Sequence, residues 1–332
     1  MNIFLTRKIP QAGLQLLEQS GHTITIWEEK RDLLPSELID FCLKNDALLS
    51  AGPSKIDAAF LEACKHLKVI ALHSVGFDQV DIAAATALRI PIGNTPGVLS
   101  DATADTAFLL MLATSRKAFS EHKRILEGNW GFFEPTAGLG IEIKGKTLGV
   151  FGLGSIGFEM ARKCVGAYGM KVIYHNRGNN LKAEQELGAV KVSFDELLAQ
   201  SDILTVHTAL TPETKGLFDI GVFKKMKPGS IFINTARGAI HNEADLIQAL
   251  EQKLIWGAGL DVTNPEPMDP SNVLLSMPNV AVLPHIGSAT VETRNAMSVI
   301  AARNILAGLA GERLPFVVNE EIYANLKLEV KN

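Results

Sequence analysis

The chain has 332 residues, of which 47% are hydrophobic and 20% charged, with a formal net charge of −4. This length suits two domains with separate cores, and the slight acidity argues against nucleic acid or an anionic membrane as a partner. The longest apolar stretch is too short to span a bilayer. The three cysteines are far apart and form neither a disulfide framework nor a metal-binding pattern. We therefore expect a cytoplasmic protein with reduced thiols and no bound metal.

The first hundred residues alternate short apolar runs with amphipathic segments. The expected strands cover residues 3–5, 23–27, 47–50, 69–73 and 91–93, and the expected helices cover 11–19, 36–44, 57–65 and 80–88. Such alternation predicts a parallel sheet covered on both faces. A long helix, apolar nearly all round in its first half, is expected from Ser100 to about Leu126.

The alternation of strands and helices restarts at Thr147. The expected strands cover residues 147–151, 171–175, 203–207, 230–235, 257–262 and 279–283; the expected helices include 155–167, 242–252 and 291–309. The sequence thus predicts an α/β fold with two doubly wound parallel sheets. We expect residues 1–99 and 288–332 to form one domain and residues 100–287 to form a second domain inserted into it.

A glycine motif follows the first strand of this second domain. It reads Gly152-Leu-Gly-Ser-Ile-Gly157 and opens an expected helix. In this pattern the first glycine allows a tight turn, the second lets the backbone approach a pyrophosphate, and the third lets helix pack on strand. The helix also directs free N–H groups and its positive dipole end at the anion. The motif predicts dinucleotide binding; the alternative is an ordinary glycine-rich turn.

Three ionisable residues follow three successive strands of the second domain. They are Arg237, Glu266 and His285. Taken singly, each has a structural explanation, as a surface arginine, a solvated glutamate between prolines, and a hydrogen-bonding histidine. Together they lie where ligands of open parallel sheets collect. Arginine binds a carboxylate with two hydrogen bonds, and histidine can protonate a carbonyl oxygen as hydride reaches the carbon. A neighbouring carboxylate favours the protonated histidine.

Several motifs carry a family resemblance over nearly the full length. They are Ser74-Val-Gly-Phe-Asp78, the segment 94–105, the glycine motif, Asn234-Thr-Ala-Arg-Gly238, Asn264-Pro-Glu-Pro267 and the segment 284–290. With these motifs the chain resembles the D-2-hydroxyacid dehydrogenases, in particular the glyoxylate/hydroxypyruvate reductase branch. The resemblance implies a Rossmann cofactor domain inserted into a flavodoxin-like substrate domain.

The resemblance also implies roles for individual residues. Arg237 would bind the substrate carboxylate, His285 would act as acid and base, and Glu266 would be its partner. Backbone N–H groups of Val75 and Gly76 would also hold the carboxylate. The expected cofactor contacts are Thr103, Gly152, Gly154, Ser155, Ile156, Gly157, Asn176, Arg177, His207, Thr235, Ala236, Asp261 and Gly287. The helix after Ser100 and the loop near Trp130 would build a homodimer.

The end of the second strand bears on which dinucleotide binds. NAD-binding units place Asp or Glu there, about 20 residues after the glycines, to bind the ribose 2′-OH. This chain has Asn176 followed by Arg177. With no carboxylate to repel it, a 2′-phosphate could lie against Arg177. We therefore expect NADP(H) to be preferred and NAD(H) to remain possible; the alternative is a solvent-facing arginine and dual specificity.

The expected enzyme reduces small 2-oxo acids with NADPH, glyoxylate to glycolate or hydroxypyruvate to D-glycerate. Two alternatives stay open. The small residues of loop 50–54 could admit a larger acid, as in a 2-ketogluconate or other sugar-acid reductase. Corepressors that sense NAD(P) share the fold and these residues, although this chain lacks a basic segment.

Overall fold

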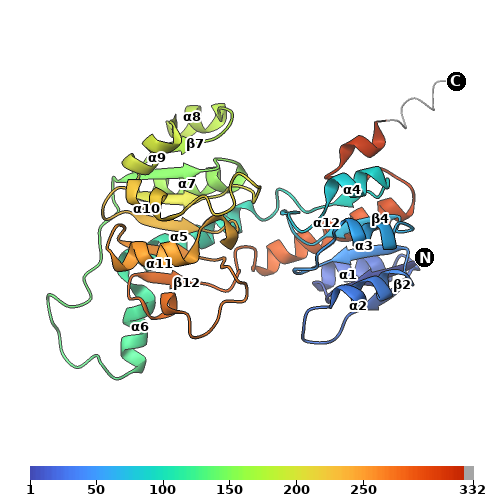
Figure 1. Ribbon diagram of the computed structural model, residues 1–332, viewed down its shortest axis with the longest axis horizontal. Coiled ribbons are helices and arrows are strands. Elements are labelled where there is room, and N and C mark those ends of the chain that lie inside the picture. Colours follow the sequence, from blue (N-terminus) through green and yellow to red (C-terminus); the bar gives the residue numbers. More distant parts are fainter. Residues whose placement is uncertain (325–332) are drawn as a thin grey trace. The chain divides into compact units, whose positions relative to one another are not determined.

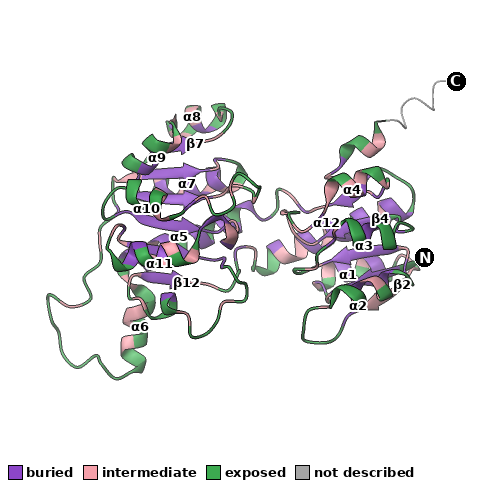
Figure 2. Ribbon diagram, viewed as in Figure 1, coloured by how far each residue is buried: buried purple, intermediate pink, exposed green. Residues whose placement is uncertain are grey.

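The computed structural model describes residues 1–324 and contains two compact units. Unit 1 comprises Met1–Leu99 and the chain from Ala289 onward, and unit 2 comprises Ser100–Ser288. Each unit holds one parallel sheet with helices on both faces (Figure 1). The inner strands of both sheets are buried, whereas the edge strands at 23–26 and 190–191 are partly exposed (Figure 2). The predicted α/β class with two parallel sheets is confirmed.

Unit 1 is built on a five-stranded sheet with the order β2-β1-β3-β4-β5. Its strands are β1 (Asn2–Leu5), β2 (Thr23–Ile26), β3 (Ala47–Ser50), β4 (Val69–Leu72) and β5 (Ile92–Gly93). Its helices are α1 (Gln11–Glu18), α2 (Pro35–Cys42), α3 (Ala58–Ala63), α4 (Ile82–Ala87) and α12 (Val291–Leu309). This strand order is that of flavodoxin-like sheets.

The two faces of this sheet follow from the two-residue period of a strand. Ile3 and Leu5 pack with α1 and α12 on one face, whereas Phe4, between them, packs with α2 and α3 on the other. Both faces are therefore apolar, as parallel sheets require. After α12 the chain returns to this sheet, where Val317 forms an antiparallel bridge with Gly93. Residues 325–332 of the expected tail lie outside the described residues.

Unit 2 is built on a seven-stranded sheet with the order β12-β11-β10-β9-β6-β7-β8. Its strands are β6 (Thr147–Phe151), β7 (Lys171–His175), β8 (Val190–Lys191), β9 (Ile203–Val206), β10 (Ile231–Asn234), β11 (Gly257–Leu260) and β12 (Val280–Val282). Its helices are α5 (Ser100–Arg116), α6 (Ala118–Leu126), α7 (Ser155–Tyr168), α8 (Leu181–Leu187), α9 (Phe194–Gln200), α10 (Ile220–Lys225) and α11 (Glu243–Glu251). The order reverses at β6, which is the switch point where Rossmann sheets bind dinucleotides.

Two features of unit 2 differ from the sequence prediction. The single helix expected from Ser100 to about Leu126 is wrong: it breaks at Lys117, whose φ of 53° is left-handed and interrupts the helix between α5 and α6. The strand β8 was not predicted, because two residues are too short for a hydrophobic period. No described helix is long and apolar enough to cross a membrane.

Candidate active site

Arg237, Glu266 and His285 follow β10, β11 and β12, which are neighbours in the sheet of unit 2. The strands run parallel, so their carboxyl ends meet at one edge. The short buried strands end where the chain turns polar, and each turn carries one of the three side chains. The edge thus gathers three ionisable groups from segments far apart in the sequence.

Glu266 and His285 form a hydrogen-bonded pair. His285 Nδ1 lies 2.5 Å from Glu266 Oε1, and both side chains are partly exposed. Burial alone would raise the pKa of Glu266, but the hydrogen bond and charge of His285, with a contribution from the Arg237 charge, hold it below its ordinary value. Glu266 is therefore ionised at neutral pH. Its bond to Nδ1 leaves His285 Nε2 as the ring nitrogen that can exchange a proton with a ligand.

The backbone around His285 is held by Asp261. His285 has a left-handed φ of 55°, which is unfavourable for a residue with a side chain. The carboxylate of Asp261, 1% exposed, accepts hydrogen bonds from the N–H groups of Ile286 (2.8 Å) and Gly287 (2.7 Å). Burial raises the pKa of Asp261, against the effect of these two bonds. Asp261 thus holds the turn that presents His285 toward Glu266.

The turn that carries Arg237 is held by Asn234, the last residue of β10. The Asn234 Nδ2 donates to the Arg237 carbonyl (2.9 Å), and its Oδ1 accepts from the Ala236 N–H (2.9 Å). A Cβ on Gly238 would lie 1.9 Å from the carbonyl oxygen of Thr263, so only glycine lets this turn approach the segment that leads to Glu266. The close approach explains why the Arg237 charge acts on Glu266.

The glycine motif adopts the geometry that a pyrophosphate needs. Gly152 has a φ of 95°, and a Cβ there would lie 2.8 Å from the His207 carbonyl carbon. A Cβ on Gly154 would meet no described atom within 4 Å, so this position is open to a ligand. Within residues 1–324, no side chain caps the N-terminus of α7. Its first N–H groups, at Ser155 to Gly157, can therefore bind an anion.

Asn176 lies beside the glycine motif, but both of its side-chain polar atoms bond to the backbone. Its Oδ1 accepts from the Leu153 N–H (2.7 Å), and its Nδ2 donates to the Leu153 carbonyl (3.1 Å). The amide thereby joins the end of β7 to the glycine turn. Arg177, the next residue, is exposed, and Lys191 Nζ donates to its carbonyl (3.2 Å). The Lys191 ammonium group therefore lies beside the backbone of Arg177.

The other expected cofactor residues of unit 2 fall into two groups. His207 lies between two hydroxyl groups: Thr205 Oγ1 is 2.8 Å from its Nε2, and Thr235 Oγ1 is 3.4 Å from its Nδ1. Burial lowers the pKa of His207 to about 3. A neutral imidazole thus lies beside the glycine turn. A Cβ on Gly287 would lie 3.0 Å from Asp261 Oδ2 and 3.2 Å from the Thr103 methyl carbon, so these three residues are neighbours.

Val75 and Gly76 lie in unit 1, in the loop after β4. The Val75 carbonyl accepts from Asn94 Nδ2 (2.9 Å), and the Gly76 carbonyl accepts from the Ser74 hydroxyl (2.7 Å). These side-chain bonds fix the loop from the carbonyl side. Within residues 1–324, the N–H groups of Val75 and Gly76 donate to no protein acceptor. The backbone can therefore offer two donors from a fixed loop.

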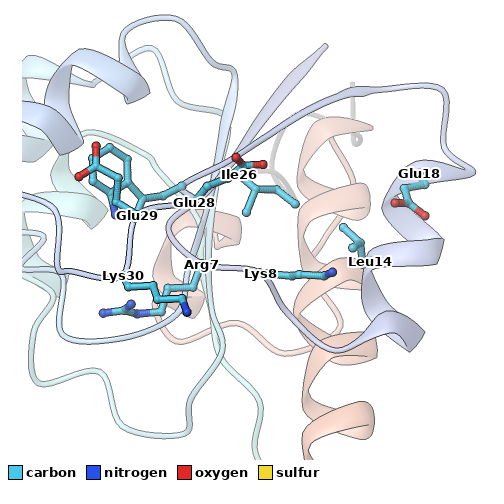
Figure 3. Close-up of a pocket in the computed structure, with 9 residues that line it drawn as sticks. Arg7, Lys8, Leu14, Glu18, Ile26, Glu28, Glu29 and Lys30 are labelled. Atoms are coloured by element: carbon cyan, nitrogen blue, oxygen red, sulfur yellow. The ribbon is translucent and has the colours of Figure 1, made fainter.

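A separate hollow in unit 1 contains none of these residues. It has a volume of about 670 Å³ and is shown in Figure 3. Its lining includes Arg7, Lys8, Leu14, Glu18, Ile26, Trp27, Glu28, Glu29 and Lys30. Three basic and three acidic side chains balance there, so the hollow offers no net charge to a carboxylate or phosphate. The carboxyl edge of the sheet in unit 2, with its three ionisable groups, is therefore the stronger candidate site.

Comparison with known proteins identifies the family. Residues 108–287 match the family described as D-isomer specific 2-hydroxyacid dehydrogenase, NAD binding domain. A glyoxylate reductase of Thermococcus litoralis is 40% identical over 324 residues, covering 96% of this chain and 97% of the relative. The chain belongs to the D-isomer specific 2-hydroxyacid dehydrogenase family. It is therefore an oxidoreductase with a dinucleotide-binding domain, and the expected resemblance is confirmed.

Solved structures of this family have the same fold. A glyoxylate reductase from Paecilomyes thermophila is 34% identical with a TM-score of 0.86, covering 97% of this chain and 99% of that one. An NADPH-dependent glyoxylate/hydroxypyruvate reductase from Sinorhizobium meliloti, in complex with NADP and malonate, is 32% identical with a TM-score of 0.83, covering 96% and 97%. The family's fold thus extends over nearly the whole of this chain.

Two site residues were not singled out from the sequence. Asn234 belongs to one of the family motifs, but the sequence assigned it no role. Leu153 is an apolar residue of the glycine motif and was also assigned none. A buried asparagine that ends an apolar strand could have indicated Asn234, because a buried amide must find hydrogen-bond partners. Nothing in the local sequence indicates the backbone pairing of Leu153 with Asn176.

Proposed function

We propose that this dehydrogenase is an NADPH-preferring reductase of small 2-oxo acids, converting glyoxylate to glycolate and hydroxypyruvate to D-glycerate. The observation that carries the proposal is the Glu266–His285 pair, with an Nδ1–Oε1 distance of 2.5 Å, at the same sheet edge as Arg237. An acid–base pair beside a carboxylate-binding cation suits a 2-oxo acid, which has both a carboxylate and a carbonyl. The names of the relatives point to the same substrates.

Each of the three residues has a distinct part in the reaction. Arg237 binds the substrate carboxylate through two parallel hydrogen bonds, which fixes the orientation of the adjacent carbonyl. His285 Nε2 donates a proton to the carbonyl oxygen, and the ionised Glu266 stabilises the protonated ring that precedes the transfer. NADPH, when bound, supplies the hydride that the carbonyl carbon receives. Hydride and proton together convert the C=O group to CH–OH.

The backbone donors of unit 1 would add to carboxylate binding. We include Val75 and Gly76 in the proposal because their loop is fixed by Asn94 and Ser74. Two N–H groups suit a carboxylate, which accepts several hydrogen bonds. Unit 1 is therefore proposed as the substrate domain, and unit 2 as the cofactor domain.

The preference for NADPH rests on the end of β7. Where NAD-binding units place an acidic residue for the ribose 2′-OH, this chain has Asn176, whose amide pairs with Leu153. Arg177 is exposed beside that position, and Lys191 adds a second cation. A 2′-phosphate would meet the positive charge of Arg177, which also acts on the carboxylate of Glu213 and lowers its pKa. The remaining predicted contacts are proposed for both dinucleotides: Gly152, Gly154, Ser155, Ile156, Gly157, Thr103, His207, Thr235, Ala236, Asp261 and Gly287.

We also propose a homodimer formed through α6 and the loop that follows it. The helix has no buried residue, and Figure 2 shows its exposed surface continuing into the loop. Trp130, Phe132 and Phe133 are 70%, 72% and 83% exposed, which is unusual for aromatic side chains. Association would cover them. Sedimentation should give the mass of a dimer, and a monomer at micromolar concentration would exclude this interface.

The three cysteines are free and buried, which suits the proposed cytoplasmic location.

A panel of 2-oxo acids assayed with NADPH and NADH tests the function. We expect rapid NADPH oxidation with glyoxylate and hydroxypyruvate, and D-glycerate as the product of the latter. Faster turnover of 2-ketogluconate would favour the sugar-acid reductase, for which the small residues of loop 50–54 leave room. Tight NADPH binding with no turnover of any acid would favour a cofactor sensor and reject the proposal.

A further inference from the structure

The Asn234 amide uses both of its N–H groups and its oxygen in bonds to nearby groups. One N–H of Nδ2 donates to the Arg237 carbonyl and the Oδ1 accepts from Ala236 N–H, so the amide bonds the backbone on both sides of the Ala236–Arg237 peptide. The second N–H of Nδ2 points to Nδ1 of His241, at 3.1 Å. Asn234 is fully buried, so water cannot replace any of these partners. The orientation of the amide therefore fixes the turn that carries Arg237.

His241 can act as the acceptor of this bond because its ring is neutral. The side chain is 2% exposed, and burial lowers its pKa to about 4. Its ring also meets Phe232 edge to face, with centroids 5.9 Å apart. With Nδ1 accepting, the ring proton must lie on Nε2.

The tautomer that serves Asn234 leaves Nε2 buried without a hydrogen-bond partner among the described residues. An unpartnered buried N–H is unfavourable, and native structures contain few. An aliphatic side chain would fill the same space next to Phe232 with no such penalty. The feature that histidine has and an aliphatic residue lacks is the acceptor at Nδ1.

We propose that His241 is a positioning residue for substrate binding: through Nδ1 it holds the Asn234 amide, and through that amide it holds the backbone from which Arg237 reaches the substrate carboxylate. This inference rests on the proposed function, in which Arg237 binds that carboxylate. His241 touches neither substrate nor cofactor in this account. It acts on the Michaelis constant for the 2-oxo acid more than on the turnover number, because its effect is on carboxylate binding.

Two substitutions at this position separate the acceptor from the bulk of the side chain. His241→Leu keeps an apolar side chain of similar size but removes the acceptor. His241→Asn can place an amide oxygen near the position of Nδ1 and so keep it. We expect KM for glyoxylate to rise about tenfold or more in His241→Leu, corresponding to the loss of one buried hydrogen bond, with kcat and KM for NADPH changing less than about threefold. His241→Asn should restore KM to within about threefold of the wild type.

Binding of oxamate, an unreactive analogue that carries the carboxylate, gives a second readout that is independent of turnover. Its Kd should rise in parallel with KM. Phe232→Leu is the matched control: it alters the ring contact of His241 but leaves the bond to Asn234, and KM should stay near that of the wild type. Melting temperatures identify any variant that fails to fold. If His241→Leu is unfolded, His241→Phe, which keeps an aromatic ring, replaces it with the same expectation.

The outcomes distinguish this inference from the proposed function. An unchanged KM and oxamate Kd in His241→Leu would overturn the inference, as would equal increases in His241→Leu and His241→Asn. A fall in kcat with no change in KM would also overturn it. Failure of the wild type to reduce any 2-oxo acid would instead reject the proposed function, whatever the variants do.

Discussion

Replacement of Asp261 by asparagine tests how the turn around His285 is held. The two carboxylate oxygens accept from the N–H groups of Ile286 and Gly287 at 2.8 and 2.7 Å. Asparagine has the same shape but a single acceptor oxygen, so in Asp261→Asn one of these N–H groups faces an NH₂ group. The backbone bond from His285 N–H to the Asp261 carbonyl, at 2.8 Å, is unaffected.

The size of the effect follows from the charge and burial of Asp261. A hydrogen bond to a charged group contributes about 1.5–3 kcal/mol, and one such bond is lost. Burial raises the pKa of Asp261, so the neutral amide avoids part of the cost of a buried charge. We therefore expect the free energy of unfolding of unit 2 to fall by about 2 kcal/mol. This loss is similar in size to the cost of holding His285 at a positive φ, which is roughly 1–3 kcal/mol. The turn should therefore open, and turnover should fall.

Two measurements check this prediction. Urea unfolding gives the change in stability, and hydrogen exchange of peptides that contain residues 285–287 reports on the turn directly. Asp195→Asn is the control, since Asp195 is exposed and its ion pair with Lys225 should contribute less than about 1 kcal/mol. Unchanged exchange at the turn, together with a stability within about 0.5 kcal/mol of the wild type, would refute the role assigned to Asp261.

Two further predictions concern the cofactor and the pH dependence of stability. Arg177→Ala should raise KM for NADPH by about 10- to 100-fold and leave KM for NADH nearly unchanged. Lys171→Ala, at the other end of β7, should change neither KM. Equal increases of KM for both cofactors in Arg177→Ala would contradict the 2′-phosphate role. Because the pKa of His241 is lowered from 6.5 to about 4, the unfolded chain binds its proton first as the pH falls. The His241 contribution to stability is therefore complete above pH 6.5 and decreases toward pH 4, by about 3 kcal/mol. In urea unfolding, the wild type should therefore lose about 3 kcal/mol more stability than His241→Leu between pH 6.5 and pH 4. If the stabilities of the two proteins fall in parallel with pH, the prediction is wrong.

The two sheets, and the placement of three ionisable residues at one sheet edge, could be predicted from the sequence because both depend on local patterns. Short apolar runs identify buried strands, and polar residues directly after them must lie at the carboxyl edge of a parallel sheet. This is how Arg237, Glu266 and His285 were found. The prediction failed at Lys117, where a single left-handed residue divides a helix without any glycine or proline to indicate it.

Other features depend on contacts between distant segments and could not be predicted locally. Asn176 was expected to face the cofactor, but its amide also pairs with Leu153, 23 residues earlier. Asp261 was expected to contact the cofactor; the structure adds its two bonds to the turn after His285. In both cases the residue was found from its position in the motif, and its hydrogen-bond partners became known only from the fold.

The most direct test of the proposed chemistry is the turnover of His285→Ala with glyoxylate and NADPH, measured beside the Kd for NADPH. His285 provides the proton in this account and makes no contact on which cofactor affinity depends. We predict that kcat falls by about 10²- to 10⁴-fold while the Kd for NADPH stays within about threefold of the wild type. Turnover within about tenfold of the wild type would contradict the account, because another group would then have to supply the proton.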